Sequence, residues 1–183
     1  PAEGGADVIL TGPGADIVMG GAAGDEINAG TEANGDNSQD IVIGDNGFGM
    51  FDGDGRLDLI ESTHTHIGGS DTINAGGGPD IVFGGAEADA IHAESGRDII
   101  LGDNGIATFD DLIVPLVVES TAPLDGGPDA IFAGPGHDIV FGGTTDDEMH
   151  GGAEHDILLG DHGRYDIAYP VNQRFRSIYT LNE

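Results

Sequence analysis

The chain of 183 residues lacks cysteine, lysine and tryptophan. The absence of cysteine excludes a disulfide framework, thiolate catalysis and cysteine-ligated zinc or iron–sulfur sites. Five arginines stand against 34 aspartates and glutamates, so the formal net charge is −29. Nucleic acids and anionic membrane surfaces bind clusters of positive charge, so we expect no nucleic acid and no membrane insertion. The expected partners are cations.

Long hydrophobic runs are also missing. Residues 1–10 contain no basic segment followed by an apolar stretch, so we expect no signal peptide or membrane span there and interpret the chain as part of a longer protein. Glycine, in contrast, is abundant, with 34 residues, while isoleucine, valine, leucine and phenylalanine remain frequent. This composition excludes collagen and simple disorder, and it indicates a folded chain with many tight turns.

The sequence repeats with a long period. Glycine–aspartate tetrapeptides begin at Gly44, Gly102 and Gly160, which are 58 residues apart each time. We therefore expect three repeat units, 1–65, 66–123 and 124–183, that together form one continuous solenoid.

A shorter period lies inside each unit. Twelve aspartates recur at intervals of nine residues, with one six-residue insertion between Asp25 and Asp40. Two positions after each aspartate stands an apolar residue, such as Val18 or Ile73. A glycine-rich turn followed by aspartate and an x-apolar-x triplet predicts a short strand whose central side chain points inward. Stacked coils of this kind form a solenoid around a narrow apolar core.

This nine-residue pattern is similar to the repeat G-G-x-G-x-D-x-U-x of the RTX family. The resemblance implies an all-β, right-handed parallel β-roll (β-solenoid) with two nonapeptides per turn and Ca²⁺ held between coils n and n+2. Aspartate carboxylates and turn carbonyls would be the ligands. No coil carries all three glycines of the motif, so we expect weak or empty sites where a turn requires positive φ. The implied metal ligands are Asp7, Asp16, Asp25, Asp40, Asp71, Asp80, Asp89, Asp98, Asp129, Asp138, Asp147 and Asp156.

Stacking is expected to bring these aspartates together in pairs. Six ions are expected, or about ten if every gap between coils n and n+2 is filled. Without cations the like charges would oppose the compact state, so metal binding and folding should be one event. The alternative is that the aspartates only form Asx turns. The expected pairs are Asp7 with Asp25, Asp16 with Asp40, Asp71 with Asp89, Asp80 with Asp98, Asp129 with Asp147, and Asp138 with Asp156.

The strand triplets of the even-numbered coils are apolar throughout, as in 41–43 and 81–83, which indicates a sheet buried on both faces. The segments 48–65, 106–123 and 164–183 alternate apolar and polar residues over two short stretches. We expect each to form a β-hairpin that covers this sheet. The alternative is that the apolar stripe is a surface for lateral self-association. The aspartates that begin the hairpins, Asp45, Asp103 and Asp161, are interpreted as turn formers, with a ligand role as the alternative.

The sequence does not favour an enzyme. Acid–base catalysis needs a unique, positioned carboxylate or histidine, whereas the repeat offers equivalent aspartates twelve times. The resemblance implies a calcium-binding structural segment of a large secreted or cell-surface protein, adhesin-like, exported by type I secretion and folding outside the cell as a rigid spacer. The alternatives are an accessory RTX module of a secreted enzyme or toxin, and a self-associating filament or matrix protein that uses the apolar even-coil face.

Overall fold

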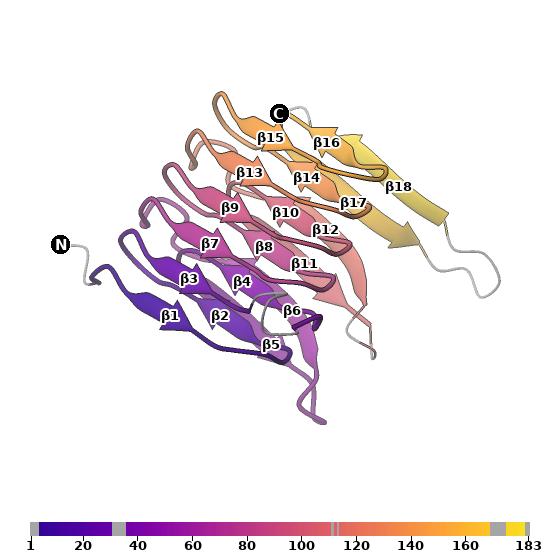
Figure 1. The fold of residues 1–183 in the computed structure, drawn as a ribbon, viewed down its shortest axis with the longest axis horizontal. Coiled ribbons are helices and arrows are strands. Elements are labelled where there is room, and N and C mark those ends of the chain that lie inside the picture. The colour runs from indigo at the N-terminus through magenta and orange to yellow at the C-terminus, as the bar shows by residue number, and fades with distance from the viewer. Residues whose placement is uncertain (1–3, 31–35, 111, 113, 169–174, 182–183) are drawn as a thin grey trace.

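The computed structural model describes residues 4–30, 36–110, 112, 114–168 and 175–181, and within these ranges it contains strands and turns without a helix. The strands form three six-stranded sheets, here called A, B and C. Figure 1 shows them as layers, with the strands of each sheet stacked in steps from the N-terminal to the C-terminal end. Since the described part of the chain has no helix, it has none that could cross a membrane.

Sheets A and B are parallel and contain one three-residue strand from each nonapeptide coil. Every strand pairs with the strand two coils further along, so that Ile27 lies beside Ile73 in sheet A and Val42 beside Val82 in sheet B. This register confirms the expected β-roll with two coils per turn. Sheet A consists of β1 (Val8–Leu10), β3 (Glu26–Asn28), β7 (Thr72–Asn74), β9 (Ala90–His92), β13 (Ala130–Phe132) and β15 (Glu148–His150). Sheet B consists of β2 (Ile17–Met19), β4 (Ile41–Ile43), β8 (Ile81–Phe83), β10 (Ile99–Leu101), β14 (Ile139–Phe141) and β16 (Ile157–Leu159).

The core between sheets A and B contains the central residue of each strand, as the nonapeptide pattern predicts. Ile73, Val82 and Ile100 are fully buried in it. Alanines that directly follow the strands of sheet A, such as Ala75 and Ala93, fill the same layer. Leu158 is 40 % exposed because its strand β16 has a neighbour on one side only.

Sheet C is antiparallel and consists of three hairpins, one from each repeat. They are β5 (Gly47–Phe51) with β6 (Leu57–Ser62), β11 (Gly105–Phe109) with β12 (Pro115–Ser120), and β17 (Gly163–Ala168) with β18 (Phe175–Thr180). The hairpins also pair with one another, β6 with β11 and β12 with β17, which makes one continuous sheet. The Oγ of Ser62 accepts a hydrogen bond from the N–H of Gly105 at 3.1 Å, and Ser120 and Gly163 repeat this contact at 3.2 Å.

Sheet C covers the outer face of sheet B, which confirms the hairpin prediction. Ile81, Phe83 and Leu101 of sheet B pack against Ile60 and Phe109 of sheet C in a second buried core. The glycine that begins each hairpin permits this contact. A side chain at Gly105 would collide with Leu101, and side chains at Gly47 and Gly163 would meet Ile43 and Phe141.

Candidate calcium sites

The twelve repeat aspartates form two continuous ladders along the β-roll, one on each side. In each ladder the backbone N–H of one aspartate donates a hydrogen bond to Oδ1 of the aspartate two coils further along, at 2.6–3.1 Å. The odd ladder contains Asp7, Asp25, Asp71, Asp89, Asp129 and Asp147. The even ladder contains Asp16, Asp40, Asp80, Asp98, Asp138 and Asp156.

All six expected pairs are neighbours in these ladders. The structure also places aspartates of successive repeats side by side with the same hydrogen bond, as in Asp25 with Asp71 and Asp40 with Asp80. The contacts of Asp89 with Asp129 and of Asp98 with Asp138 complete this set. The gaps between repeats therefore have the same backbone geometry as the gaps within them.

The second carboxylate oxygen of most ladder aspartates has no hydrogen-bond partner among the described residues. Burial of an unpaired carboxylate oxygen is costly, because its hydration is lost without replacement. A row of such atoms requires either protons or cations. The buried, unpartnered Oδ2 atoms belong to Asp25, Asp40, Asp71, Asp80, Asp89, Asp98, Asp129, Asp138 and Asp147.

Burial raises the pKa of these carboxyl groups. Loss of solvation is the largest cause, the hydrogen bond from the preceding aspartate opposes it, and the charges of neighbouring aspartates add to it. These effects raise the pKa of Asp89 to about 10, of Asp98 to about 9 and of Asp80 to about 8. The largest shifts are in the middle of the ladders. At neutral pH the metal-free ladder must therefore bind protons or bear a large electrostatic cost.

Backbone carbonyl groups converge on the same places as the unpartnered oxygens. A side chain at Gly20 would collide with both the carbonyl oxygen of Gly44 and Oδ2 of Asp25. The first glycine of each later turn on this side is in the same position, because a carbonyl oxygen of the neighbouring turn and Oδ2 of the next aspartate of the odd ladder both lie close to it. These glycines are Gly44, Gly84, Gly102 and Gly142.

This donor set fits Ca²⁺, which prefers six to eight oxygen ligands and accepts carbonyls together with carboxylates. The described residues contain no cluster of three or more histidine, aspartate or glutamate side chains arranged around one point. A site that depends on carboxylate clusters or on histidine is therefore not favoured in this part of the chain. The alternation of carboxylate and carbonyl oxygens matches a hard cation bound between turns.

The turns keep a left-handed backbone even where the third glycine of the motif is replaced. Ala23, Glu87, Thr145 and Glu154 occupy that position with φ of 67° to 77°. These substitutions leave the hydrogen bonds of the adjacent aspartates in place, as at Asp89. The missing glycines are thus accommodated by local backbone strain at individual turns.

The aspartates that begin the hairpins hold turns together. Oδ1 of Asp45 accepts a hydrogen bond from the N–H of Gly69, where the chain returns from the hairpin, at 3.0 Å, and Oδ2 accepts one from the N–H of Ala86 at 2.5 Å. Asp103 accepts the corresponding hydrogen bonds from Gly127 and Thr144. Because backbone donors occupy both oxygens, these contacts support the role of turn former that the sequence suggested for Asp45 and Asp103.

The sequence analysis missed one buried carboxylate, Asp36. It is 1 % exposed, its Oδ1 accepts a hydrogen bond from the N–H of Ser38 at 3.0 Å, and its Oδ2 is unpartnered among the described residues. Its charge helps to raise the pKa of Asp40 and Asp80, which places it beside the even ladder. The triplet 35–37, which repeats the Gly-Asp-Asn of 44–46, could have identified it.

Comparison with known proteins gives a match at the level of the repeat. Residues 2–35, 67–100 and 125–161, more than half of the chain, match the family described as RTX calcium-binding nonapeptide repeat (4 copies). Neither a curated protein nor a solved structure matches the chain. The repeat is a calcium-binding structural element and not a catalytic one. The nonapeptide register, the stacked aspartates and this match agree, and the chain belongs to the RTX calcium-binding repeat family.

Proposed function

We propose that this chain is a calcium-dependent structural segment whose folding is driven by ions bound along the two aspartate ladders. The observation that carries the proposal is the row of buried, unpartnered Oδ2 atoms. Ca²⁺ bound there would neutralise the ladder charges and supply the missing electrostatic partner for each oxygen. The ligands are the twelve ladder aspartates together with turn carbonyls such as those of Gly44 and Gly102.

The ladders support more than six ions. Neighbouring aspartates contact each other in the same way within repeats and between them, as in Asp71 with Asp89 and Asp89 with Asp129. We propose that every gap of both ladders takes an ion, which gives about ten in this chain, the upper value expected from the sequence. Each 58-residue unit, 1–65, 66–123 and 124–183, would then be a structural repeat that shares sites with its neighbours.

A rigid, secreted spacer is the role that this arrangement supports best. RTX repeats typically occur in secreted bacterial proteins. A chain with the large negative charge found here would stay expanded where free Ca²⁺ is scarce and would become a stiff rod where it is plentiful. This behaviour suits export by type I secretion followed by folding outside the cell, in a large surface protein of adhesin-like architecture.

The two alternative functions differ in the support they receive. Sheet C packs on the outer face of sheet B within the chain, which weighs against a filament or matrix protein that uses the apolar even-coil face. An accessory module attached to a secreted enzyme or toxin would have the same ladders. The order of domains in the full-length protein separates that alternative from a spacer array.

Small-angle X-ray scattering tests the proposal directly. In Ca²⁺ the radius of gyration should be near the value of about 16 Å for a compact chain of this length, and in chelator at neutral pH it should approach about 45 Å. A chain that is equally compact in chelator and in Ca²⁺ would show that folding does not depend on the metal.

A further inference from the structure

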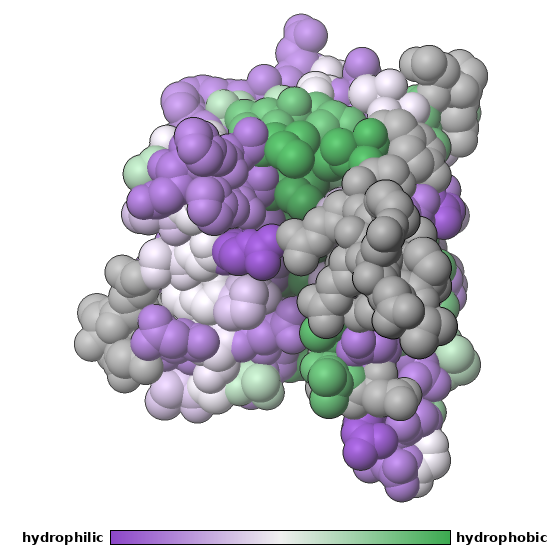
Figure 2. Space-filling model, turned by 90° about the vertical axis from the view of Figure 1, so that its right-hand side faces the viewer, coloured by the Kyte–Doolittle hydropathy of each residue, from purple (hydrophilic) through white to green (hydrophobic). Residues whose placement is uncertain are grey.

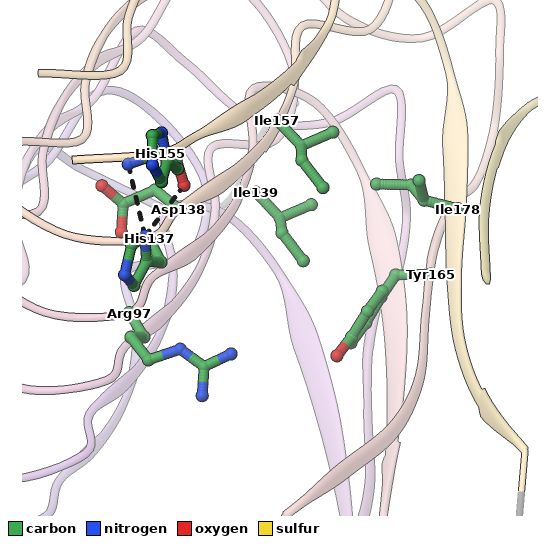
Figure 3. Close-up of a pocket in the computed structure, with 8 residues that line it drawn as sticks. All are labelled: Arg97, His137, Asp138, Ile139, His155, Ile157, Tyr165 and Ile178. Atoms are coloured by element: carbon green, nitrogen blue, oxygen red, sulfur yellow. Dashed lines mark hydrogen bonds between the residues drawn. The ribbon is translucent and has the colours of Figure 1, made fainter. Parts of the chain in front are cut away.

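A groove runs between the β-roll and sheet C, on the side of the even ladder. Two cavities of about 520 Å³ and 360 Å³ make up this groove, and Arg97, His137, Ile139 and Tyr165 line both. Figure 3 shows the larger one, with isoleucines of sheet B facing Tyr165 and Ile178 of sheet C. Figure 2 shows hydrophobic surface on this side of the molecule, next to hydrophilic surface. The size suits a small organic ligand.

The two sheets supply an apolar floor and wall. The floor consists of the first residues of consecutive strands of sheet B, and the wall contains Tyr165 and Ile178 of the third hairpin with Val114 and Pro115 of the second. Residues from two hairpins and from five coils thus meet in one groove. The floor residues are Ile81, Ile99, Ile139 and Ile157.

The rim of the groove contains a cation with no carboxylate partner. Arg56 forms ion pairs with Asp52 and Asp54, and Arg164 pairs with Glu119 and Asp166. Arg97, the third arginine whose side chain the structure describes, forms no ion pair with any described residue. Arg97 is exposed, so its guanidinium group is accessible to a ligand from solvent. Its guanidinium group presents several donors suited to a carboxylate.

Two histidines continue this rim. The rings of His137 and His155 are stacked, with centroids 5.9 Å apart, and Nδ1 of His137 lies 3.1 Å from the carbonyl oxygen of His155. Figure 3 shows these rings on the β-roll side of the cavity, across from Tyr165. Together with Arg97 they give the groove a polar edge, and the buried ladder aspartates Asp80, Asp98 and Asp138 also border it.

The first repeat lacks this combination. Gln39 takes the position that Arg97 holds 58 residues later, and Ala15 lies in the turn before it. Both line a smaller cavity of about 120 Å³ beside Ile17 and Ile41. Gln39 also lines the edge of the 360 Å³ cavity, but the first repeat supplies no arginine to it, so the charge is not a property of the repeat as such.

We propose that this groove binds an amphipathic monocarboxylate, with its apolar body on the isoleucine floor and the Tyr165 ring and its carboxylate at Arg97. The apolar lining accounts for the body, and the unpaired guanidinium accounts for the anionic group. A purely polar anion would leave the exposed surface of Ile139 and Ile157 without an apolar partner. A neutral apolar compound would leave Arg97 without one.

The test uses 2-naphthoate, a fluorescent aromatic carboxylate, and its neutral isostere 2-naphthamide, with the protein in saturating Ca²⁺ throughout. Wild type should bind naphthoate saturably and about tenfold or more tighter than naphthamide. The Arg97→Gln variant, which introduces the residue of the first repeat, should lose this preference. Arg56→Gln, on the turn of the first hairpin, is the matched control and should bind as wild type does.

The outcomes separate the proposal from its alternatives. Equal binding of naphthoate and naphthamide, or unchanged naphthoate binding by Arg97→Gln with an unchanged circular dichroism spectrum, would overturn it, as would the absence of saturable binding. A Tyr165→Phe variant keeps the ring and should retain naphthoate binding, whereas Ile139→Asp, on the groove floor, should abolish it. Because all variants are measured in the calcium-loaded form, failure here leaves the calcium proposal intact.

Discussion

The β-roll and the hairpin sheet are stabilised in different ways, although one repeat contains both. In sheet C the polar groups of the turns have partners within the chain, as where Oδ1 of Asp52 accepts hydrogen bonds from the N–H groups of Asp54 and Arg56 at 2.7 and 2.9 Å. In the β-roll most ladder aspartates, such as Asp89 and Asp98, have one satisfied oxygen and one without a partner among the described residues. From this difference we infer that the turns of the β-roll make stability depend on metal, whereas the hairpins stabilise the molecule by apolar packing.

The largest effect should be the pH dependence of the metal-free chain. The ladder carboxyls have a higher pKa in the folded chain than in the unfolded chain, so the folded state binds more protons and its stability must fall as pH rises. In chelator the stability should therefore be greatest near about pH 4 and should decline towards about pH 10, the folded-state pKa of Asp89. Circular dichroism across this range measures it. A metal-free chain with constant β-structure from acid to alkaline pH would remove the distinction between roll and hairpins.

The next largest effect is that of one substitution, which should lower stability in Ca²⁺ and raise it in chelator. In Ca²⁺ the Asp89→Asn variant should lose about 3–5 kcal/mol of unfolding free energy, because a ligand and its compensating charge leave a buried site. In chelator the same variant should be more stable than wild type, since the amide needs no proton at neutral pH. Urea unfolding in Ca²⁺ and the midpoint of the pH transition in chelator measure the two effects.

The matched control for this variant lies in the hairpin sheet. Asp52→Asn changes a partly exposed turn carboxylate whose pKa is lowered, chiefly by a hydrogen bond from the backbone N–H of Arg56. It should alter stability far less than Asp89→Asn does, with or without Ca²⁺. If Asp52→Asn and Asp89→Asn behaved alike, the ladders would have no special role.

A core substitution should affect the hairpin sheet without changing the number of bound ions. Ile60 is fully buried between sheets B and C, so Ile60→Ala should cost about 2–4 kcal/mol in Ca²⁺. Isothermal titration should still count the same number of ions as in wild type. Ile106→Ala, at a half-buried position of the same sheet, is the control and should cost less. Loss of ions on removal of Ile60 would mean that the hairpins form part of the metal sites.

The smallest effect concerns backbone strain in the turns. Thr145 has φ of 77°, a conformation that disfavours β-branched residues, so Thr145→Gly should raise stability in Ca²⁺ by about 1 kcal/mol. The neighbouring Thr144 donates a hydrogen bond from Oγ1 to Asp103 at 2.6 Å, so Thr144→Gly should lower stability. Thermal unfolding of the two variants would show opposite shifts of Tm. A decrease of Tm in both would indicate that strain at Thr145 is negligible.

The sequence predicts the parts of this structure that follow from a strict period. The nine-residue spacing determines which side chains, such as Ile73 and Val82, point into the core, because a shift of one residue would turn the whole strand over. The apolar triplets of the even coils predict a covering element, and the alternation in 48–65 identifies it. These features depend on local geometry alone.

The sequence does not predict the parts that arise from contacts between repeats. The pairing of β6 with β11 joins separate hairpins into one sheet. The groove brings Arg97 of the roll next to Tyr165 of a hairpin, two residues with no shared motif. Asp36 stands at a position of the nonapeptide where the motif has glycine. The repeat pattern therefore does not predict a carboxylate there.

The most direct test of calcium-coupled folding is a far-ultraviolet circular dichroism titration of the chain from chelator into Ca²⁺ at neutral pH, with Mg²⁺ as the control. The ladders predict little β-structure in chelator, a cooperative rise to the β-rich spectrum on addition of Ca²⁺, and no such transition with Mg²⁺, which requires a small octahedral site. A β-rich spectrum in chelator that Ca²⁺ leaves unchanged would contradict the account, because the unpartnered carboxylates would then be tolerated without a metal.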